Sequence, residues 1–156
     1  MDLTRFDASD AATVADWASD GDETRRWCSL DRVGSDTVAG WAATADVEAF
    51  ALHDPASGLP VAYGEVWFDD DEGEAELAHL IVAPTARRRG VGRALVEALV
   101  ARAHARHPLA TLRVVPDNDV AIRCYRAAGF RRATPEEEAA WNVGQPRAYV
   151  WMLRPR

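Results

Sequence analysis

The run Arg87-Arg88-Arg89-Gly90-Val91-Gly92 is the part of the sequence best suited to chemistry. Glycine has no Cβ, so a pair of glycines lets the backbone approach a ligand closely. At a helix start the backbone N–H groups are unpaired and the helix dipole favours an anion. Arginine side chains add charge and can bind phosphate oxygens in pairs. The run therefore predicts a phosphate-binding loop. The alternative, a basic helix start without a ligand, leaves the helix-weakening glycine pair unexplained.

Two other phosphate-binding motifs can be tested on the same residues. A dinucleotide-binding fingerprint would need a third glycine at position 95, which is Leu95. A P-loop would need Gly-Lys-Ser/Thr, but all 18 basic residues of the chain are arginine. Both motifs are therefore excluded.

A strand and a helix must hold this run in place. The apolar residues from Leu77 to Ala83 predict a strand, and Pro84 ends it because proline cannot continue a sheet ladder. A helix is predicted from about Gly90 to before Pro108. Its apolar face consists of Val91, Ala94, Leu95, Ala98 and Leu99.

The strand end and the loop together resemble the acyl-CoA pyrophosphate loop of the GNAT superfamily of N-acyltransferases, usually Val-x-Pro-Glu-x-Arg-Gly-x-Gly-x-Gly. Thr85 replaces the usual acid and Arg88 a common glycine. The matching residues are Val82, Pro84, Arg87, Gly90 and Gly92. The resemblance implies that acetyl-CoA is the cosubstrate and that no metal is needed. The implied acetyl-CoA-binding residues are Ile81, Val82, Arg87, Arg88, Arg89, Gly90, Val91, Gly92, Arg93 and Asn118.

A second family signature lies in residues 114–130. Its residues are Asn118, Ala121, Tyr125, Gly129 and Phe130. Residues 118, 121, 122 and 125 share one face of the helix predicted there. The resemblance implies that two parallel strands splay apart and admit the pantetheine arm, which pairs with the backbone of residues 81 and 82. Asn118 would hydrogen-bond this arm, and helix capping is an equally good interpretation of its side chain.

An amine must lose a proton before it attacks a thioester. For an amine with a pKa of about 10.4, reaching the neutral form at pH 7 costs roughly 4–5 kcal/mol. Glu76 is the predicted base, because many relatives have a carboxylate near the start of this strand. It would need burial or a relaying water, and a solvated strand-start residue is the alternative. His79 is the second candidate. On an ideal strand its side chain points to the opposite face from that of Glu76, and a bulge in the strand could bring the two to the same face.

Tyr125 is the predicted acid, because a phenol suits a thiolate leaving group; a core aromatic is the alternative interpretation. Cys124 lies about 100° around the helix from Tyr125, so we expect direct acyl transfer in a ternary complex, not an acyl-cysteine. The thioester oxygen would be held by a backbone N–H, that of Val82.

Composition narrows the class of protein. The 156 residues, 48% hydrophobic and 28% charged, are typical of one globular domain, expected over 1–156. The net charge of −7 argues against a nucleic-acid partner. No apolar run approaches about 18 residues and the N-terminus is neither basic nor apolar, so we expect no membrane span, no signal peptide and a cytoplasmic location. Cys28 and Cys124 lack the spacing of metal ligands and make a disulfide a weak expectation.

The order of elements predicts a mixed α/β (α+β) fold. Short turns between strands 47–53, 61–68 and 77–83 indicate an antiparallel meander. The helical crossover makes strand 111–115 parallel to strand 77–83. Residues 134–148 are expected to form a loop, and Tyr149 to Leu153 to close the sheet. The resemblance implies a mostly antiparallel sheet of six to seven strands, splayed at two parallel strands and flanked by about four helices, with a possible homodimer through the last strands.

The acceptor is the least determined part of the prediction. Aromatic and acidic residues in turns would suit a cationic amine, although tryptophans are first of all core residues. These residues are Asp20, Asp22, Glu23, Asp69 to Glu72, Trp17, Trp27, Trp41, Trp67 and Trp141. The leading prediction is acetyl transfer to a primary amine of a small molecule. A protein acetyltransferase, which would need an open peptide groove, and a non-catalytic acyl-CoA sensor are the alternatives.

Overall fold

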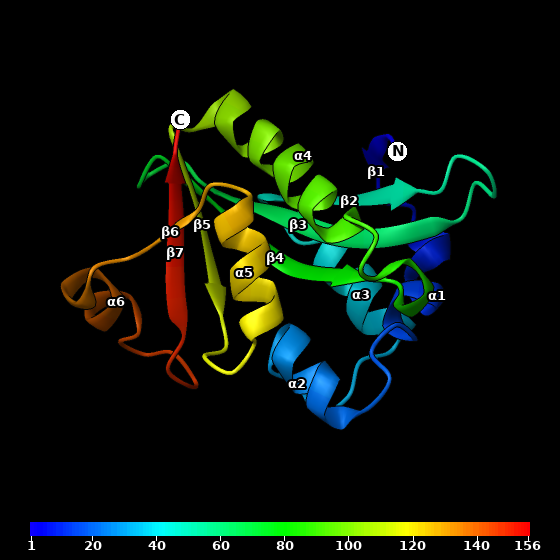
Figure 1. Cartoon of the computed structure of the whole chain (residues 1–156), viewed down its shortest axis with the longest axis horizontal. Helices are drawn as coiled ribbons and strands as arrows, with labels where there is room; N and C mark the ends of the chain where they lie inside the picture. The colour runs from blue at the N-terminus through cyan, green and yellow to red at the C-terminus, as the bar shows by residue number, and fades with distance from the viewer.

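Seven strands form one sheet, in the order β1-β2-β3-β4-β5-β7-β6, in the computed structural model, which describes residues 1–156 (Figure 1). The predicted mixed, mostly antiparallel sheet is confirmed. The strands are β1 (Leu3–Arg5), β2 (Val47–His53), β3 (Pro60–Asp69), β4 (Glu74–Val82), β5 (Leu109–Val114), β6 (Arg131–Arg132) and β7 (Val150–Pro155). The helices are α1 (Ala11–Ala15), α2 (Gly21–Cys28), α3 (Ser35–Ala42), α4 (Val91–Arg106), α5 (Asp119–Ala127) and α6 (Pro135–Trp141), with short 3-10 turns η1 (Ala8–Asp10) and η2 (Pro84–Ala86).

Strands β4 and β5 form the only parallel pair of the sheet, and they separate soon after they meet. Their register joins residues 74–76 of β4 to residues 109–111 of β5. Beyond that point β4 continues to Val82 and β5 continues to Val114, but the two strands no longer pair with each other. Because unpaired strand edges expose backbone N–H and C=O groups, the splay leaves hydrogen-bonding groups of β4 available. The predicted meander and parallel crossover are both confirmed.

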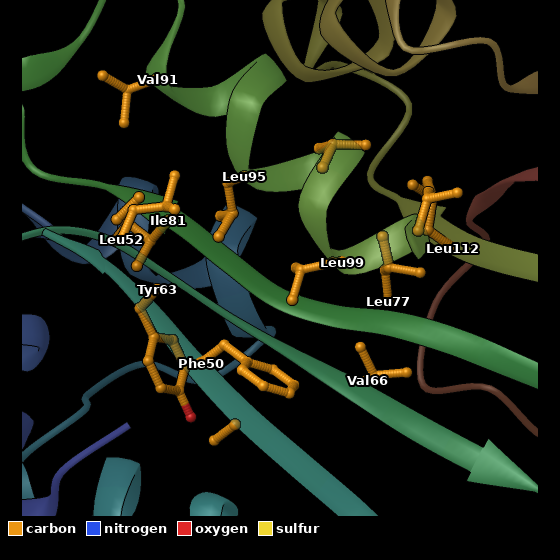
Figure 2. Packing of buried hydrophobic residues seen from close by; sticks show 14 of the residues in the cluster. Phe50, Leu52, Tyr63, Val66, Leu77, Ile81, Val91, Leu95, Leu99 and Leu112 are labelled. Carbon is orange, nitrogen blue, oxygen red and sulfur yellow. The ribbon is translucent and has the colours of Figure 1, made fainter. Parts of the chain in front are cut away.

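Helices cover both faces of the sheet. Helix α4 packs on the face that Gly64 presents, and Figure 2 shows Val91, Leu95 and Leu99 projecting from α4 toward the strands. Neighbouring strand residues point to opposite faces, so Glu65 points away from α4. Trp41 of α3 stacks on the His79 ring, and His79 bonds to Glu65. Helix α3 therefore lies on the second face. The two faces therefore hold different layers of side chains around one sheet.

The close approach of α4 predicts a stability effect at Gly64. A Cβ built there would lie 2.8 Å from Cδ1 of Leu99 and 3.4 Å from Cγ of Leu80, and Leu99 is fully buried. We expect Gly64→Ala to lower the free energy of unfolding by about 1–3 kcal/mol, because an overpacked core forces neighbours out of position. Urea denaturation measures this. Gly40→Ala in α3, where a Cβ meets nothing within 4 Å, is the control and should be neutral or stabilising; equal losses would contradict the argument.

Two details of the sequence prediction are wrong. Residues 135–141 form helix α6 instead of loop, because Thr134 and Glu137 make reciprocal capping hydrogen bonds and Pro135 occupies the first turn. With this helix the structure has six α-helices, against about four expected. Strand β7 does not close the sheet. It lies between β5 and β6, since residues 131–132 pair on its outer side, so Tyr149 to Leu153 is not a free edge for a homodimer.

None of the helices combines the length and the apolar character needed to cross a lipid bilayer.

Candidate functional site

A cavity of about 1140 Å³ occupies the space where β4 and β5 separate, and it gathers most of the residues predicted from the sequence. Predicted residues that line it are Glu76, His79, Ile81, Val82, Arg87, Arg88, Gly90, Gly92, Arg93, Asn118 and Tyr125. The two that do not are Arg89 and Val91; the Val91 side chain is buried in the hydrophobic core. Two motifs about 30 residues apart thus meet in one cavity.

The loop before α4 has the backbone of an anion-binding turn. Arg88 has φ 60° and Gly90 has φ 80°, so the chain turns through the left-handed region twice within three residues. At Gly90 this conformation favours glycine, whereas at Arg88 it is uncommon. The N–H groups of Val91, Gly92 and Arg93 bond to no acceptor in the protein, and the first bond of the helix runs from Ala94 to Gly90. These free donors at a helix N-terminus can receive a phosphate.

The four arginines of this loop differ in their contacts. Arg87 donates to the carbonyl groups of Val82 and Trp17 and is 2.6 Å from a Glu23 oxygen. Its side chain therefore joins the end of β4 to α2 and the turn after α1. Arg93 pairs with Glu97 on α4 at 2.8 Å.

Arg88 lines the cavity, and no ion pair holds its guanidinium. Arg89 contributes positive charge near Asp54, on the β2–β3 turn. Of the four, Arg88 is therefore best placed to bind a phosphate group with its side chain.

Asn118 caps helix α5. Its side-chain oxygen accepts the N–H of Ala121 at 3.2 Å, which is the capping alternative weighed from the sequence. The amide nitrogen makes no hydrogen bond in the protein, although the residue lines the cavity. One side chain can thus cap the helix with its oxygen and still donate to a ligand with its nitrogen.

Tyr125 lines the cavity from helix α5. It is half-buried, and its ring packs against Phe130 with centroids 6.4 Å apart. Its hydroxyl bonds to no group of the protein and is not sealed from solvent. Burial raises the pKa of Tyr125, so the phenol stays protonated and able to donate throughout the neutral range.

Cys124 lines the same cavity, and burial raises the pKa of its thiol as well. A thiol with a raised pKa is a poor nucleophile near neutral pH. This environment agrees with direct transfer, and it also favours the protonated form of any thiol held beside Tyr125.

Glu76 faces the cavity at the point where β4 and β5 separate. Burial raises the pKa of its carboxyl, and the nearby Arg113 guanidinium opposes that rise. Nε of Arg113 lies 3.0 Å from Oε1 of Glu76, and this oxygen is buried without a well-aligned hydrogen bond. The predicted carboxylate is therefore present in the cavity, but it is ion-paired, which the sequence did not indicate.

A bulge in β4 brings His79 to the same side as Glu76. The β3–β4 register pairs Trp67 with Glu76 and Glu65 with Ala78, then shifts so that Tyr63 pairs with Ile81. Gly64 therefore faces two residues of β4, and His79 takes the left-handed conformation with φ 50°. The His79 ring reaches Glu65, and both Glu76 and His79 line the cavity.

Helix α2 runs along the cavity from the anion-binding loop, where Glu23 pairs with Arg87, to the far end at Ser29. Ser29 at its C-terminal cap and Tyr149 beside β7 share a hydrogen bond of 2.6 Å. Arg26 and Asp117, in the turn after β5, approach to 3.5 Å. Figure 1 shows α2 beside this turn and the start of α5. Contacts on both sides thus hold α2 across the cavity.

The acidic and aromatic residues proposed from the sequence separate into different environments. Trp27, Trp67, Asp20, Asp22 and Glu23 line the cavity. Trp41 contacts it through His79, whereas Trp17 and Trp141 lie in hydrophobic clusters elsewhere. Glu23 lies at the end of the cavity beside the anion-binding loop, where it pairs with Arg87. The acidic turn after β3 is remote, since Asp70 pairs with Arg106 and His107.

The structure adds residues that the sequence reasoning missed. Arg113, Tyr149 and Ser29 carry contacts at the acceptor end, and Glu65 holds His79. Only Glu65 left a signal: it is the one charged residue within the apolar run VAYGEVWF. A single charge in an otherwise apolar strand indicates either an edge or a buried, hydrogen-bonded group.

No group of three or more His, Cys, Asp or Glu side chains is placed to hold a metal ion.

Comparison with known proteins connects this geometry to a family. The model of the acetyltransferase (GNAT) family matches residues 5–130. Spermidine N-acetyltransferase from Vibrio cholerae, in complex with CoA and spermine, is similar over 99% of this chain and 94% of that chain, with a TM-score of 0.77 and 15% identity. The ribosomal-protein-S18-alanine N-acetyltransferase from Escherichia coli is similar over 99% and 92%, with a TM-score of 0.70 and 22% identity.

A third similar structure is the aminoglycoside acetyltransferase AAC(6')-Ib in complex with coenzyme A and kanamycin. The similarity covers 99% of this chain and 94% of that chain, with a TM-score of 0.74 and 21% identity. These identities are low, so the three structures show a shared fold.

Proposed function

The chain belongs to the acetyltransferase (GNAT) family and is an acetyl-CoA-dependent acetyltransferase, and on that premise we propose that it acetylates a primary amine of a small molecule. The family fixes the acyl donor and the type of reaction. The class of acceptor has to be inferred from the residues at the other end of the cavity.

The contacts that hold α2 beside the cavity are the observation that favours a small acceptor. An extended peptide needs a groove open at both ends, but the Ser29–Tyr149 hydrogen bond and the Arg26–Asp117 pair span that route. A compact amine can instead lie between Trp27, Trp67 and Tyr149. The preference for a cationic acceptor rests on Asp20 and Asp22, which line the cavity, because Arg113 already lies over the Trp67 and Tyr149 rings and pairs with Glu76.

The cosubstrate is proposed to lie along the splay. The N–H groups of Val91, Gly92 and Arg93 and the Arg88 side chain would receive the pyrophosphate. The freed edge of β4 at Ile81 and Val82 would pair with the pantetheine arm, and the Val82 N–H would hold the thioester oxygen. Arg87 would position the loop through its bonds to β4 and α2.

The acid and base roles are proposed for residues of the same cavity. Tyr125 would give its proton to the departing CoA thiolate. Glu76 is the first of the two base candidates from the sequence, and burial raises the pKa of its carboxyl. His79, the second sequence candidate, lines the cavity with it.

Turnover on a panel of acceptors tests the proposal. We expect thiol release from acetyl-CoA with at least one class among polyamines, aminoglycosides and amino acids. We expect kcat/KM for short peptides to be at least about tenfold lower, because loss of a fitted contact commonly costs 1–3 kcal/mol.

Other outcomes point to other functions. Turnover on peptides alone would favour a protein acetyltransferase. Acetyl-CoA binding by calorimetry without turnover on any acceptor would favour an acyl-CoA sensor. Exclusive use of neutral or acidic acceptors would contradict the cationic preference while leaving the small-molecule class intact.

A further inference from the structure

Glu65 is a carboxylate buried completely inside the domain. Its exposed fraction is 0%, and it comes from the middle of β3. Burying a charge is costly unless it is hydrogen-bonded. Three donors surround it: the Tyr63 hydroxyl at 2.5 Å, Nε1 of Trp67 at 2.6 Å and Nδ1 of His79 at 3.1 Å. Burial and the Glu65 charge raise the pKa of Tyr63, so that hydroxyl remains a donor.

The His79 ring is held by Glu65 and by two aromatic rings. Its backbone lies in the bulge of β4, and its carbonyl accepts Nε1 of Trp27 at 2.8 Å. Its ring stacks on Trp41, with centroids 3.8 Å apart and planes 20° apart, and meets the edge of Trp67 at 5.3 Å. Uncommon backbone conformations persist only where the surroundings enforce them, and they cluster at functional sites.

The hydrogen bond to Glu65 decides which nitrogen carries the proton. A carboxylate that already receives two donors accepts a third, so Nδ1 of His79 is the N–H donor in the neutral ring. The other nitrogen, Nε2, then has a free lone pair. It bonds to no protein group and is not a sealed buried atom. His79 lines both the large cavity and a smaller one of about 480 Å³, which Trp41, Glu65 and Trp67 also line. This is the arrangement of an oriented general base.

We infer that His79 takes the proton of the acceptor amine, ahead of Glu76, and that Glu65 is a positioning residue that acts through His79. The inference rests on the proposed function. The acceptor ammonium gives one proton to Nε2 of His79, and the neutral amine attacks the thioester carbon. A C–N bond forms, the C–S bond breaks, and the CoA sulfur receives a proton through Tyr125, which regains one from the attacking nitrogen. The proton on His79 passes to solvent, so one proton is released per amide formed.

The difference between His79 and Glu76 is one of preorganisation. Glu76 has a single charged partner, Arg113, and its Oε1 lacks an aligned donor. His79 has a carboxylate, a stacked ring and a fixed carbonyl. A base held in its reactive orientation loses less free energy on reaching the transition state.

The test substitutes Glu65→Gln. A glutamine amide nitrogen can only donate, so it cannot replace a carboxylate that receives three donors. We expect kcat to fall about 100-fold, because the wrong tautomer removes general base catalysis, with the KM for acetyl-CoA changed less than about twofold. Nitrogen-15 spectra of the imidazole rings, recorded where the rings are neutral, should show His79 as the Nδ1–H tautomer in the native protein and lose that pattern in the variant.

Three further variants complete the test. His79→Asn identifies the His79 signals and suits the left-handed backbone; it should lower kcat at least about 100-fold. Glu76→Gln should lower kcat less than about tenfold; a larger loss than in His79→Asn would overturn the inference. Asp70→Asn changes a carboxylate paired with a different histidine, His107, in the turn remote from the cavity, so the His79 tautomer should persist and kcat should change less than about threefold.

The readouts separate this inference from the proposed function. If no amine in the panel is acetylated, the proposed function fails. The nitrogen-15 spectrum of His79 still tests whether Glu65 fixes its tautomer. A native His79 found as the Nε2–H tautomer would overturn the inference even in an active enzyme. A Glu65→Gln variant with native kcat would do the same.

Discussion

Tyr125→Phe is expected to lower kcat about 100- to 1000-fold while acetyl-CoA binding remains close to native. The phenol hydroxyl is the uncommitted donor of helix α5 in the cavity, and the variant removes that one oxygen while leaving the ring packed against Phe130. General acid catalysis typically contributes factors of 10² to 10⁴, so a loss in this range is about 2.7–4 kcal/mol of transition-state stabilisation. Steady-state thiol release and calorimetric binding of acetyl-CoA measure the two quantities.

The raised pKa of Tyr125 gives this prediction a pH signature. A phenol whose pKa lies above its ordinary value stays protonated at every pH below about 10. Loss of the acid by its own ionisation should therefore not appear in the pH–rate profile of the native enzyme below that pH. The same burial raises the pKa of the neighbouring Cys124 thiol and would act likewise on a CoA thiolate, which favours protonation of the sulfur.

Tyr149→Phe is the matched control. Tyr149 lines the same cavity, but its hydroxyl is bonded to Ser29 and serves to hold α2. We expect its effect on kcat to stay below about tenfold and to appear mainly in the KM of the acceptor. Equal losses of kcat in the two variants would remove the case for Tyr125 as the acid.

Gly90→Val is expected to raise the KM for acetyl-CoA at least about tenfold. Gly90 has φ 80° and caps helix α4, and a β-branched residue is a strong outlier in that region. The loop would have to rotate its peptide planes, which turns the free N–H groups of Val91, Gly92 and Arg93 away from a common point. Loss of such donors to an anion commonly costs 1.5–3 kcal/mol each.

Gly73→Val separates this effect from simple strain. Gly73 has φ 68° in the turn before β4, and a Cβ meets nothing within 4 Å at either glycine. Both variants should therefore lose similar stability, about 1–2 kcal/mol, because the backbone penalty is the same. Only Gly90→Val should change the KM for acetyl-CoA; an equal change in both would mean that the loop does not bind the cosubstrate.

The sequence predicted the elements of the fold well where one periodicity prevailed. The alternation in 61–68 and the apolar face of 91–99 lie in β3 and α4 as expected. The prediction failed where the signal was short: Thr134-Pro135-Glu136-Glu137 is a capping box that starts α6, whereas the sequence analysis predicts a loop there. The position of β7 between β5 and β6 was also not predicted, because the pairing order of distant strands leaves no local sequence pattern.

By itself the sequence determined the family. It also predicted the anion-binding loop and the candidate acid and base, because each prediction depends on spacing within one strand–turn–helix segment. Only the tertiary structure decided which of these side chains are free to act. Arg87 is committed to Glu23, Glu76 is paired with Arg113, and His79 is turned by a bulge onto Glu65. These are contacts between residues 14 to 64 positions apart, and burial and pairing at such distances arise only when the sheet assembles.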